Sequence, residues 1–166
     1  DEVIRILRRY VPQLESVRTE RTDAGQLVVR LKDRTFDDSA SSDAVSEGTL
    51  RLLAQLLALR QGRASLLMVE EPENNLHPKL HYPLAEDFRF ASEARQILVA
   101  THSPRFVNAI RPDELWGLHR GEDGYTRVKR AADLPVVMAM LDSGGALGDL
   151  WTEGFFRAGD PLADSP

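Results

Sequence analysis

Residues 66–78 read Leu66-Leu67-Met68-Val69-Glu70-Glu71-Pro72-Glu73-Asn74-Asn75-Leu76-His77-Pro78. The four apolar residues at the start predict a short strand that is buried on both faces, as in a parallel sheet. Pro72 ends this strand, because proline cannot donate a hydrogen bond to a sheet ladder. The carboxylates of Glu70 and Glu71 therefore follow the carboxyl end of the strand, where open α/β sheets bind their ligands.

Two chemical roles suit these adjacent glutamates. Glu70 could hold a hard cation such as Mg²⁺, which prefers oxygen ligands. The side chain of Glu71 points elsewhere and could orient or deprotonate a water molecule. The alternative is that both carboxylates only solvate the end of a strand, and these two residues by themselves do not decide between the readings.

A second polar segment precedes a helix that is rich in leucine. Residues 41–51 read Ser41-Ser42-Asp43-Ala44-Val45-Ser46-Glu47-Gly48-Thr49-Leu50-Arg51. Ser46 is suited to cap the helix, and Gly48 lets the backbone approach a ligand closely. The free N–H groups of the helix N-terminus could bind an anion, although helix capping alone explains the same residues. The face that we expect to be buried contains Leu50, Leu53, Ala54 and Leu57, widened by Leu52, Leu56 and Leu59.

A second apolar strand ends in a histidine. Residues 96–104 read Gln96-Ile97-Leu98-Val99-Ala100-Thr101-His102-Ser103-Pro104. A lone histidine here would be a capping or core residue, but Glu71 follows the other apolar strand, which favours a functional role for His102. Ser103 then begins the next helix, with Phe106, Val107 and Ile110 facing inward.

The order of these segments resembles the C-terminal half of an ABC-type ATPase head. More narrowly, Glu-Glu-Pro-Glu after one strand and Thr-His-Ser-Pro after the other resemble the RecF/SMC-like predicted ATPases, over residues 45–104. The resemblance implies an α/β fold, a partial P-loop NTPase lobe with mainly parallel strands flanked by helices and with peripheral β-hairpins. It implies ATP and Mg²⁺ as cofactors, a homodimer of heads that depends on nucleotide, and a cytoplasmic protein.

The same resemblance assigns the roles around the phosphates. Glu70 is the Walker B acid, which acts on Mg²⁺ through water, although aspartate is more common at that position. Glu71 is the general base or the acid that orients the attacking water. His102 is the switch histidine, which contacts the γ-phosphate.

The resemblance also assigns residues to the dimer interface. Ser46 and Gly48 lie in the signature loop, which contacts the γ-phosphate of ATP bound to the opposite subunit. This loop departs from the common transporter form at Glu47 and Thr49. Asn75 lies in the D-loop, which crosses the interface, and His77 replaces the usual aspartate of that loop.

The sequence contains no Gly-x-x-x-x-Gly-Lys-[Ser/Thr], the loop that supplies backbone N–H groups and a lysine to the phosphates. We therefore expect residues 1–166 to form a single C-terminal lobe, whose partner is an N-terminal lobe that carries the P-loop. Alone, the chain would be inactive. The start at Asp1 rather than at methionine agrees with a processed or trimmed piece.

Composition sets wider limits. The 166 residues have a formal charge of −5, which argues against a nucleic-acid binder over its whole surface, although DNA is a possible partner of the complete protein. The absence of cysteine excludes disulfides and thiolate metal sites and fits a reducing compartment. No apolar run approaches the roughly 20 residues of a membrane-spanning helix, and no signal peptide is present at the start.

The flanking segments carry no motif of their own. Within residues 1–17 we expect a helix that ends near Pro12 and returns from an insertion. Further expectations are a hairpin over 16–33, a polar loop over 34–43, a helix over 79–91 interrupted at Pro83, a hairpin over 115–130, a helix over 136–141, a docking helix over 146–156 and a frayed end over 157–166.

Two other functions stay open at this point. A metal-dependent hydrolase or nuclease would use Glu70, Glu71 and Glu73 with His77 or His81, since His77 and His81 are four residues apart. A non-catalytic interaction lobe would keep the ATPase scaffold without turnover, but the presence of both Glu71 and His102 argues against such decay.

Overall fold

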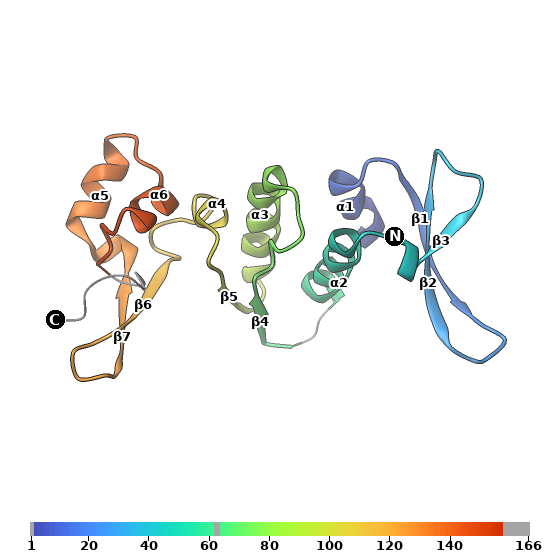
Figure 1. Ribbon diagram of the computed structural model, residues 1–166, viewed down its shortest axis with the longest axis horizontal. Coiled ribbons are helices and arrows are strands. Elements are labelled where there is room, and N and C mark those ends of the chain that lie inside the picture. The colour runs from blue at the N-terminus through green and yellow to red at the C-terminus, as the bar shows by residue number, and fades with distance from the viewer. Residues whose placement is uncertain (1, 62–63, 158–166) are drawn as a thin grey trace. The chain divides into compact units, whose positions relative to one another are not determined.

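The computed structural model describes residues 2–61 and 64–157 (Figure 1). The described residues form two compact units, one within residues 2–80 and 87–99 and the other within residues 81–86 and 100–157. No helix of the described residues is long and apolar enough to cross a membrane.

The first unit begins with a helix and an antiparallel sheet. Helix α1 (Glu2–Tyr10) buries one face and ends just before Pro12, close to the end that we expect, and residues 14–17 belong to the next strand. Strands β1 (Leu14–Arg21) and β2 (Leu27–Asp33) confirm the predicted hairpin. The predicted loop over 34–43 is partly wrong, since β3 (Ser39–Ser41) pairs with β2 and is followed by the 3-10 turn η1 (Ser42–Ala44) (Figure 1).

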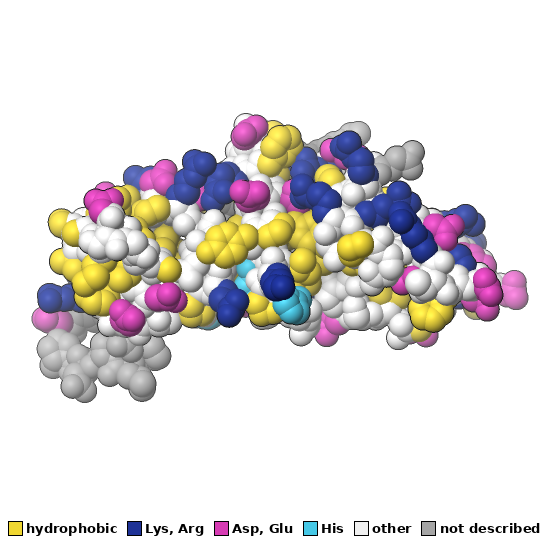
Figure 2. Space-filling view, turned by 90° about the horizontal axis from the view of Figure 1, so that it is seen from above, with side chains coloured by type: hydrophobic (Ala, Val, Ile, Leu, Met, Phe, Trp, Pro, Cys, Tyr) yellow, Lys and Arg dark blue, Asp and Glu magenta, His cyan; other side chains and the backbone are white. Residues whose placement is uncertain are grey.

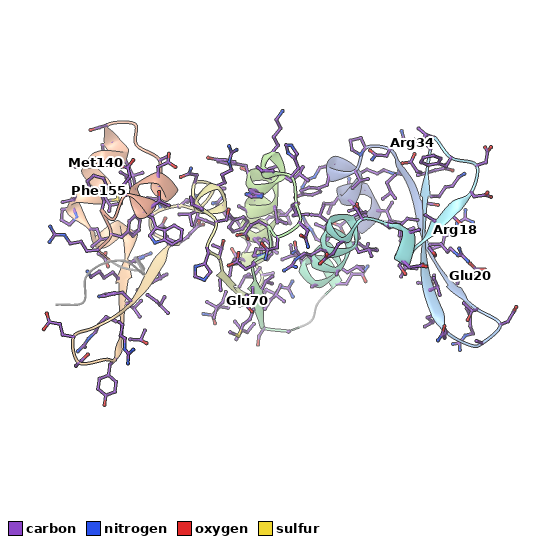
Figure 3. The ribbon with its side chains drawn as sticks, in the orientation of Figure 1. Arg18, Glu20, Arg34, Glu70, Met140 and Phe155 are labelled. Atoms are coloured by element: carbon purple, nitrogen blue, oxygen red, sulfur yellow. The ribbon has the colours of Figure 1, made fainter. Side chains whose placement is uncertain are left out.

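Figure 3 labels Arg18 and Glu20 on β1, two residues apart and therefore on the same face of the strand. Glu20 accepts a hydrogen bond from Arg30 of β2 at 2.7 Å. Both side chains are exposed, so this ion pair adds little stability. We assign no chemistry to this sheet.

Helix α2 (Glu47–Gln61) is the leucine-rich helix that the sequence predicts. Leu53 is buried as expected, but Leu57 and Ala54 are exposed, and the most buried leucines are Leu52, Leu56 and Leu59. These three residues have the i, i+4, i+7 spacing of one helix face. The leucines are so numerous that periodicity alone did not identify which of them face the core.

Strands β4 (Leu66–Glu70) and β5 (Gln96–Ala100) pair in a two-stranded sheet. The N–H of Gln96 donates to the carbonyl of Ser65 at 2.9 Å, so both strands start at the same end and run parallel. In both strands exposed and half-buried residues alternate. Our prediction of burial on both faces is wrong for this chain, because Met68 is 70% exposed and Leu98 is 47% exposed.

A 3-10 turn, η2 (Pro78–Leu80), precedes α3 (His81–Ser92). The expected helix over 79–91 therefore starts again at His81, with Pro83 in its first turn, where proline is tolerated. In the first unit Asp87 of α3 is buried and binds three side chains: Arg9 at 2.6 and 2.7 Å, Tyr10 at 2.5 Å and Arg60 at 3.3 Å. Burial, and then the hydrogen bond to Asp87, raise the pKa of Tyr10.

The second unit contains the predicted hairpin, β6 (Trp116–Arg120) with β7 (Thr126–Arg130), and three helices that surround an apolar core. Helices α4 (Pro104–Val107), α5 (Pro135–Asp142) and α6 (Leu147–Thr152), with the 3-10 turn η3 (Ala131–Asp133), contribute to this core. Its buried members are Val107, Ala131, Val137, Leu147, Leu150 and Phe156.

The C-terminal segment docks as expected, although its helix α6 ends at Thr152. Phe155, labelled in Figure 3 with Met140 of α5, packs on the core from beyond the helix. Of the segment that we expected to fray, residues 158–166 lie outside the described residues. The α/β class is confirmed, but the expected predominance of parallel strands is corrected, because the peripheral sheets are antiparallel.

Candidate functional site

Glu70 and Glu71 lie at the carboxyl end of β4, as the sequence predicts. Glu70, labelled in Figure 3, is exposed and shares the uncovered strand face with Leu66 and Met68. Glu71 is half-buried and has a φ of 43°. A positive φ is uncommon for a residue other than glycine and costs about 1–2 kcal/mol.

Two side chains of α2 hold this turned backbone. One nitrogen of the Arg51 guanidinium, Nη2, donates to the carbonyl oxygens of Glu70 at 3.2 Å and of Glu71 at 2.9 Å. One helical turn later, the amide of Gln55 donates to the carbonyl of Pro72 at 2.8 Å. Three consecutive carbonyls, those of residues 70–72, therefore accept hydrogen bonds from a single helix.

The Arg51 contacts depend on the conformation of Glu71. Consecutive carbonyls of an extended strand point to opposite sides, so one nitrogen can reach both only where the chain turns. A hydrogen bond to a charged group contributes about 1.5–3 kcal/mol. Even at the low end of that range, which suits a half-exposed guanidinium, two such bonds match or exceed the strain of the positive φ.

The loop after Glu71 packs against the N-terminus of α2. Gly48 is buried there, and a Cβ atom on it would lie 2.3 Å from the carbonyl oxygen of Asn75. Asn75 itself has a φ of 64°. Backbone hydrogen bonds from Asn74 to Glu71 at 3.1 Å and from Leu76 to Glu73 at 3.0 Å close the loop. The structure thus brings together two of the predicted site residues, Gly48 and Asn75.

Ser46 caps α2 as the sequence predicts. Its hydroxyl oxygen accepts a hydrogen bond from the N–H of Thr49 at 3.3 Å and lies 2.9 Å from the Thr49 hydroxyl. Ser46 as a residue is exposed. The cap satisfies one of the donors that the first helical turn leaves without a partner.

His102 belongs to the second unit and is exposed after β5. The turn that carries it is fixed by its neighbours: the N–H of Ser103 donates to the Thr101 hydroxyl at 3.0 Å, and the Ser103 hydroxyl accepts from the N–H of Phe106 at 3.3 Å. Ser103 is thus the N-cap of α4, as expected. Phe106 is buried and anchors the turn.

The residues of the alternative metal site differ from one another in burial. Glu73 and His81 are buried, whereas His77 is exposed and accepts a hydrogen bond from the N–H of Lys79 at 3.2 Å. The ring of His81 lies 6.4 Å from that of Phe106, between centroids. Over residues 2–61 and 64–157, no three His, Cys, Asp or Glu side chains gather in a group that could hold a metal ion.

The sequence reasoning missed Arg51 and Gln55. A signal was available, because Gln55 interrupts a run of leucines on a mostly buried helix. Gln55 is 8% exposed, and its carbonyl oxygen has no hydrogen-bond partner among the described residues. A buried polar group without a partner destabilises a fold, so such a residue calls for a reason other than packing.

Comparison with solved structures finds heads of SMC ATPases. A structure from work on ATP-driven dimerization and DNA-stimulated activation of SMC ATPases has a TM-score of 0.61 and 17% identity, and the match covers 85% of this chain and 87% of that chain. The Smc head bound to the C-winged helix domain of ScpA has a TM-score of 0.61 and 18% identity, and the match covers 76% of this chain and 40% of that chain. The Pyrococcus yayanosii Smc head domain with a coiled coil and joint has a TM-score of 0.60 and 19% identity, and the match covers 86% of this chain and 28% of that chain.

At these identities the structural likeness shows the fold, which is that of an SMC ATPase head in the P-loop NTPase class. This chain spans less than half of the second and third of these structures. No curated protein matches it. Residues 2–108 match the family described as AAA domain, putative AbiEii toxin, Type IV TA system, and since this is more than half of the sequence, the chain belongs to that family of ABC-like ATPases.

Proposed function

We propose that this chain is the C-terminal half of an ABC-type ATPase head, which binds and hydrolyses ATP together with an N-terminal lobe that carries the P-loop. Membership of the ATPase family and the SMC-head fold support this proposal. The order of the capped helix α2, of β4 with its two glutamates and of β5 followed by His102 supports it independently.

The observation that carries the proposal is the uncovered face of the β4–β5 sheet. Leu66, Met68 and Leu98 are exposed on strands that run parallel, although parallel sheets are normally covered on both faces. A two-stranded sheet is also marginal by itself. The same face ends in the carboxylate of Glu70, so a lobe that covers the apolar residues brings its own groups next to that carboxylate.

The roles of the acids follow from this placement. The exposed carboxylate of Glu70 fits Mg²⁺, which is commonly bound by one or two carboxylates, waters and the phosphates of the substrate. The metal would neutralise charge on the phosphates as the bond to the leaving phosphate breaks. Glu71, fixed by its backbone, would orient the attacking water and accept its proton, and His102 would contact the γ-phosphate.

Ser46 and Gly48 would serve a second nucleotide in a dimer of heads. Ser46 is exposed at the start of α2, where free N–H groups and the helix dipole favour a phosphate. Asn75 lies against Gly48, so the two proposed interface segments form one surface. Dimerisation would follow the nucleotide state of both heads.

DNA and a role in DNA repair or phage defence are proposals that rest on the family resemblance alone. On the face shown in Figure 2, Lys and Arg side chains are interspersed with Asp and Glu side chains. With a formal charge of −5, any DNA contact would use a local group of basic residues or another part of the complete protein. A cytoplasmic location is proposed on the same basis.

Titration calorimetry with Mg-ATP tests the proposal on this chain alone and on the complete protein with its P-loop lobe. We expect little binding by the chain alone and tight binding by the complete protein. Glu71→Gln in the complete protein should abolish turnover and retain ATP binding. Tight ATP binding by the isolated chain would refute the assignment of phosphate binding to the P-loop lobe. Turnover at the wild-type rate by Glu71→Gln would refute the assignment of Glu71 as the base.

A further inference from the structure

We propose that Arg51 and Gln55 are positioning residues for the ATPase reaction, which hold the backbone of Glu71 in its left-handed conformation and so aim its carboxylate at the attacking water. The inference rests on the proposed function, since it assumes that Glu71 orients that water. It concerns two side chains of α2 that are not expected to touch the nucleotide.

Arg51 holds the backbone on both sides of the Glu71 α-carbon. Its Nη2 nitrogen bonds the carbonyls of Glu70 and Glu71 together, at 3.2 and 2.9 Å. An extended Glu71 would point these two carbonyls to opposite sides, so the double contact requires a turned backbone, which Glu71 has at its observed φ of 43°. Arg51 therefore stabilises the turned conformation of Glu71 over an extended one.

Gln55 holds the next carbonyl of the same loop from a buried position. Its amide nitrogen bonds the carbonyl of Pro72 at 2.8 Å, while its amide oxygen is buried with no hydrogen-bond partner among the described residues. A leucine here would remove the unpaired amide oxygen, but it would leave the buried carbonyl of Pro72 without its donor. What the glutamine provides, with one buried oxygen left unpaired, is a fixed carbonyl one residue after Glu71.

Position matters here because the reaction depends on the aim of one carboxylate. A misplacement of about 1 Å can lower a rate by on the order of 100-fold, even when its origin lies away from the chemistry. The left-handed φ of Glu71 rotates its side chain relative to that of an extended residue at the same place. Losing the conformation would leave the carboxylate present but turned away from the water.

The test compares variants of the complete protein by steady-state kinetics and by urea unfolding. Arg51→Gln should lower kcat by on the order of 10- to 100-fold with little change in KM for ATP, and Arg51→Lys, which keeps a cationic donor, should restore part of the loss. Gln55→Leu should also lower kcat, by more than any accompanying fall in the urea midpoint accounts for, since it removes one buried unpaired oxygen but leaves the Pro72 carbonyl without its donor. Arg95→Gln is the matched control, because Arg95 also donates to a backbone carbonyl of α2, that of Ala58, away from Glu71.

The outcomes separate this inference from the proposed function. If Glu71→Gln abolishes turnover but Arg51→Gln and Gln55→Leu keep the wild-type kcat, the positioning role is overturned and the ATPase assignment stands. If Glu71→Gln itself keeps turnover, the assignment of the base fails first. A kcat for Gln55→Leu that falls only in proportion to lost stability, or a loss in Arg95→Gln as large as that in Arg51→Gln, would show a structural role and overturn the inference.

Discussion

Replacing Gly48 by alanine tests the contact between α2 and the loop that carries Asn75. The new Cβ atom would lie 2.3 Å from the Asn75 carbonyl oxygen, whereas ordinary contacts begin at 3.4 Å, so the loop has to retreat by about 1 Å. Overpacking of this kind costs about 1–3 kcal/mol. Alanine is better than glycine in a helix by at most about 1 kcal/mol. Because the obstructing atom belongs to the backbone, the upper half of the overpacking range applies, and we expect a net loss of about 1–2 kcal/mol in the free energy of unfolding.

Urea unfolding measures this loss as a lower midpoint with an unchanged slope. Gly25→Ala is a useful comparison, because nothing lies within 4 Å of its Cβ and only its φ of 79° resists the substitution. In the complete protein, Gly48→Ala should also lower ATP turnover, since the retreat displaces the loop next to Glu71. A Gly48→Ala variant as stable as the wild type, or more stable, would refute the close approach.

Three further predictions concern other parts of the chain. Burial and Asp87 raise the pKa of Tyr10 in the folded protein, so above pH 10 the unfolded state ionises first and stability falls by about 1.4 kcal/mol per pH unit. Tyr10→Phe should remove this part of the alkaline loss of stability, which unfolding at several alkaline pH values measures, with Tyr125→Phe at an exposed tyrosine as control. Phe156→Ala should lower the free energy of unfolding by about 3–5 kcal/mol, because Phe156 is 1% exposed in the core of the second unit; urea unfolding that is unchanged would contradict this packing. Met68→Asp should change the free energy of unfolding of the isolated chain by less than about 0.5 kcal/mol, since Met68 is 70% exposed. In the complete protein it should weaken ATP binding, because a lobe that covers this face would bury the new charge, and wild-type ATP affinity would contradict the proposed docking.

Local signals in the sequence were sufficient for most of the secondary structure. The hairpins over β1–β2 and β6–β7 follow from apolar and β-branched runs on either side of a short polar turn that contains glycine. Ser103 before Pro104 correctly predicts the start of α4, because both residues act on the helix end that they occupy. Such predictions depend on neighbours in the sequence, which are fully known.

The errors concern contacts with distant residues. The apolar run of β4 predicts burial on both faces, yet whether a face is covered depends on what packs there, and in this chain Met68 stays exposed. The buried side of α2 was ambiguous, because leucines occupy almost every direction around the helix. β3 was missed, because the three small residues Ser39, Ala40 and Ser41 form a strand only when the edge of β2 is available to pair with them.

The sequence suggests residue types for the candidate site but not its conformation. Glu70, Glu71 and His102 are proposed as site residues because they lie at or just after the ends of apolar strands. The positive φ of Glu71 has no signature in the sequence, since glutamate is not a residue that favours it. Arg51 was given no role from the sequence, and its bonds to two carbonyls follow only from the packing of α2 beside the end of β4.

The helical spacing of α2 limits which insertions this region tolerates. Gly48, Arg51 and Gln55 are three and four residues apart, so they share one face of the helix, and all three contact the chain between Glu70 and Asn75. One extra residue between Gly48 and Arg51 would rotate the later contacts by about 100°. An insertion before Ser46 would leave the face intact, so the loop that leads into α2 is free to change length while the first two turns of the helix are not.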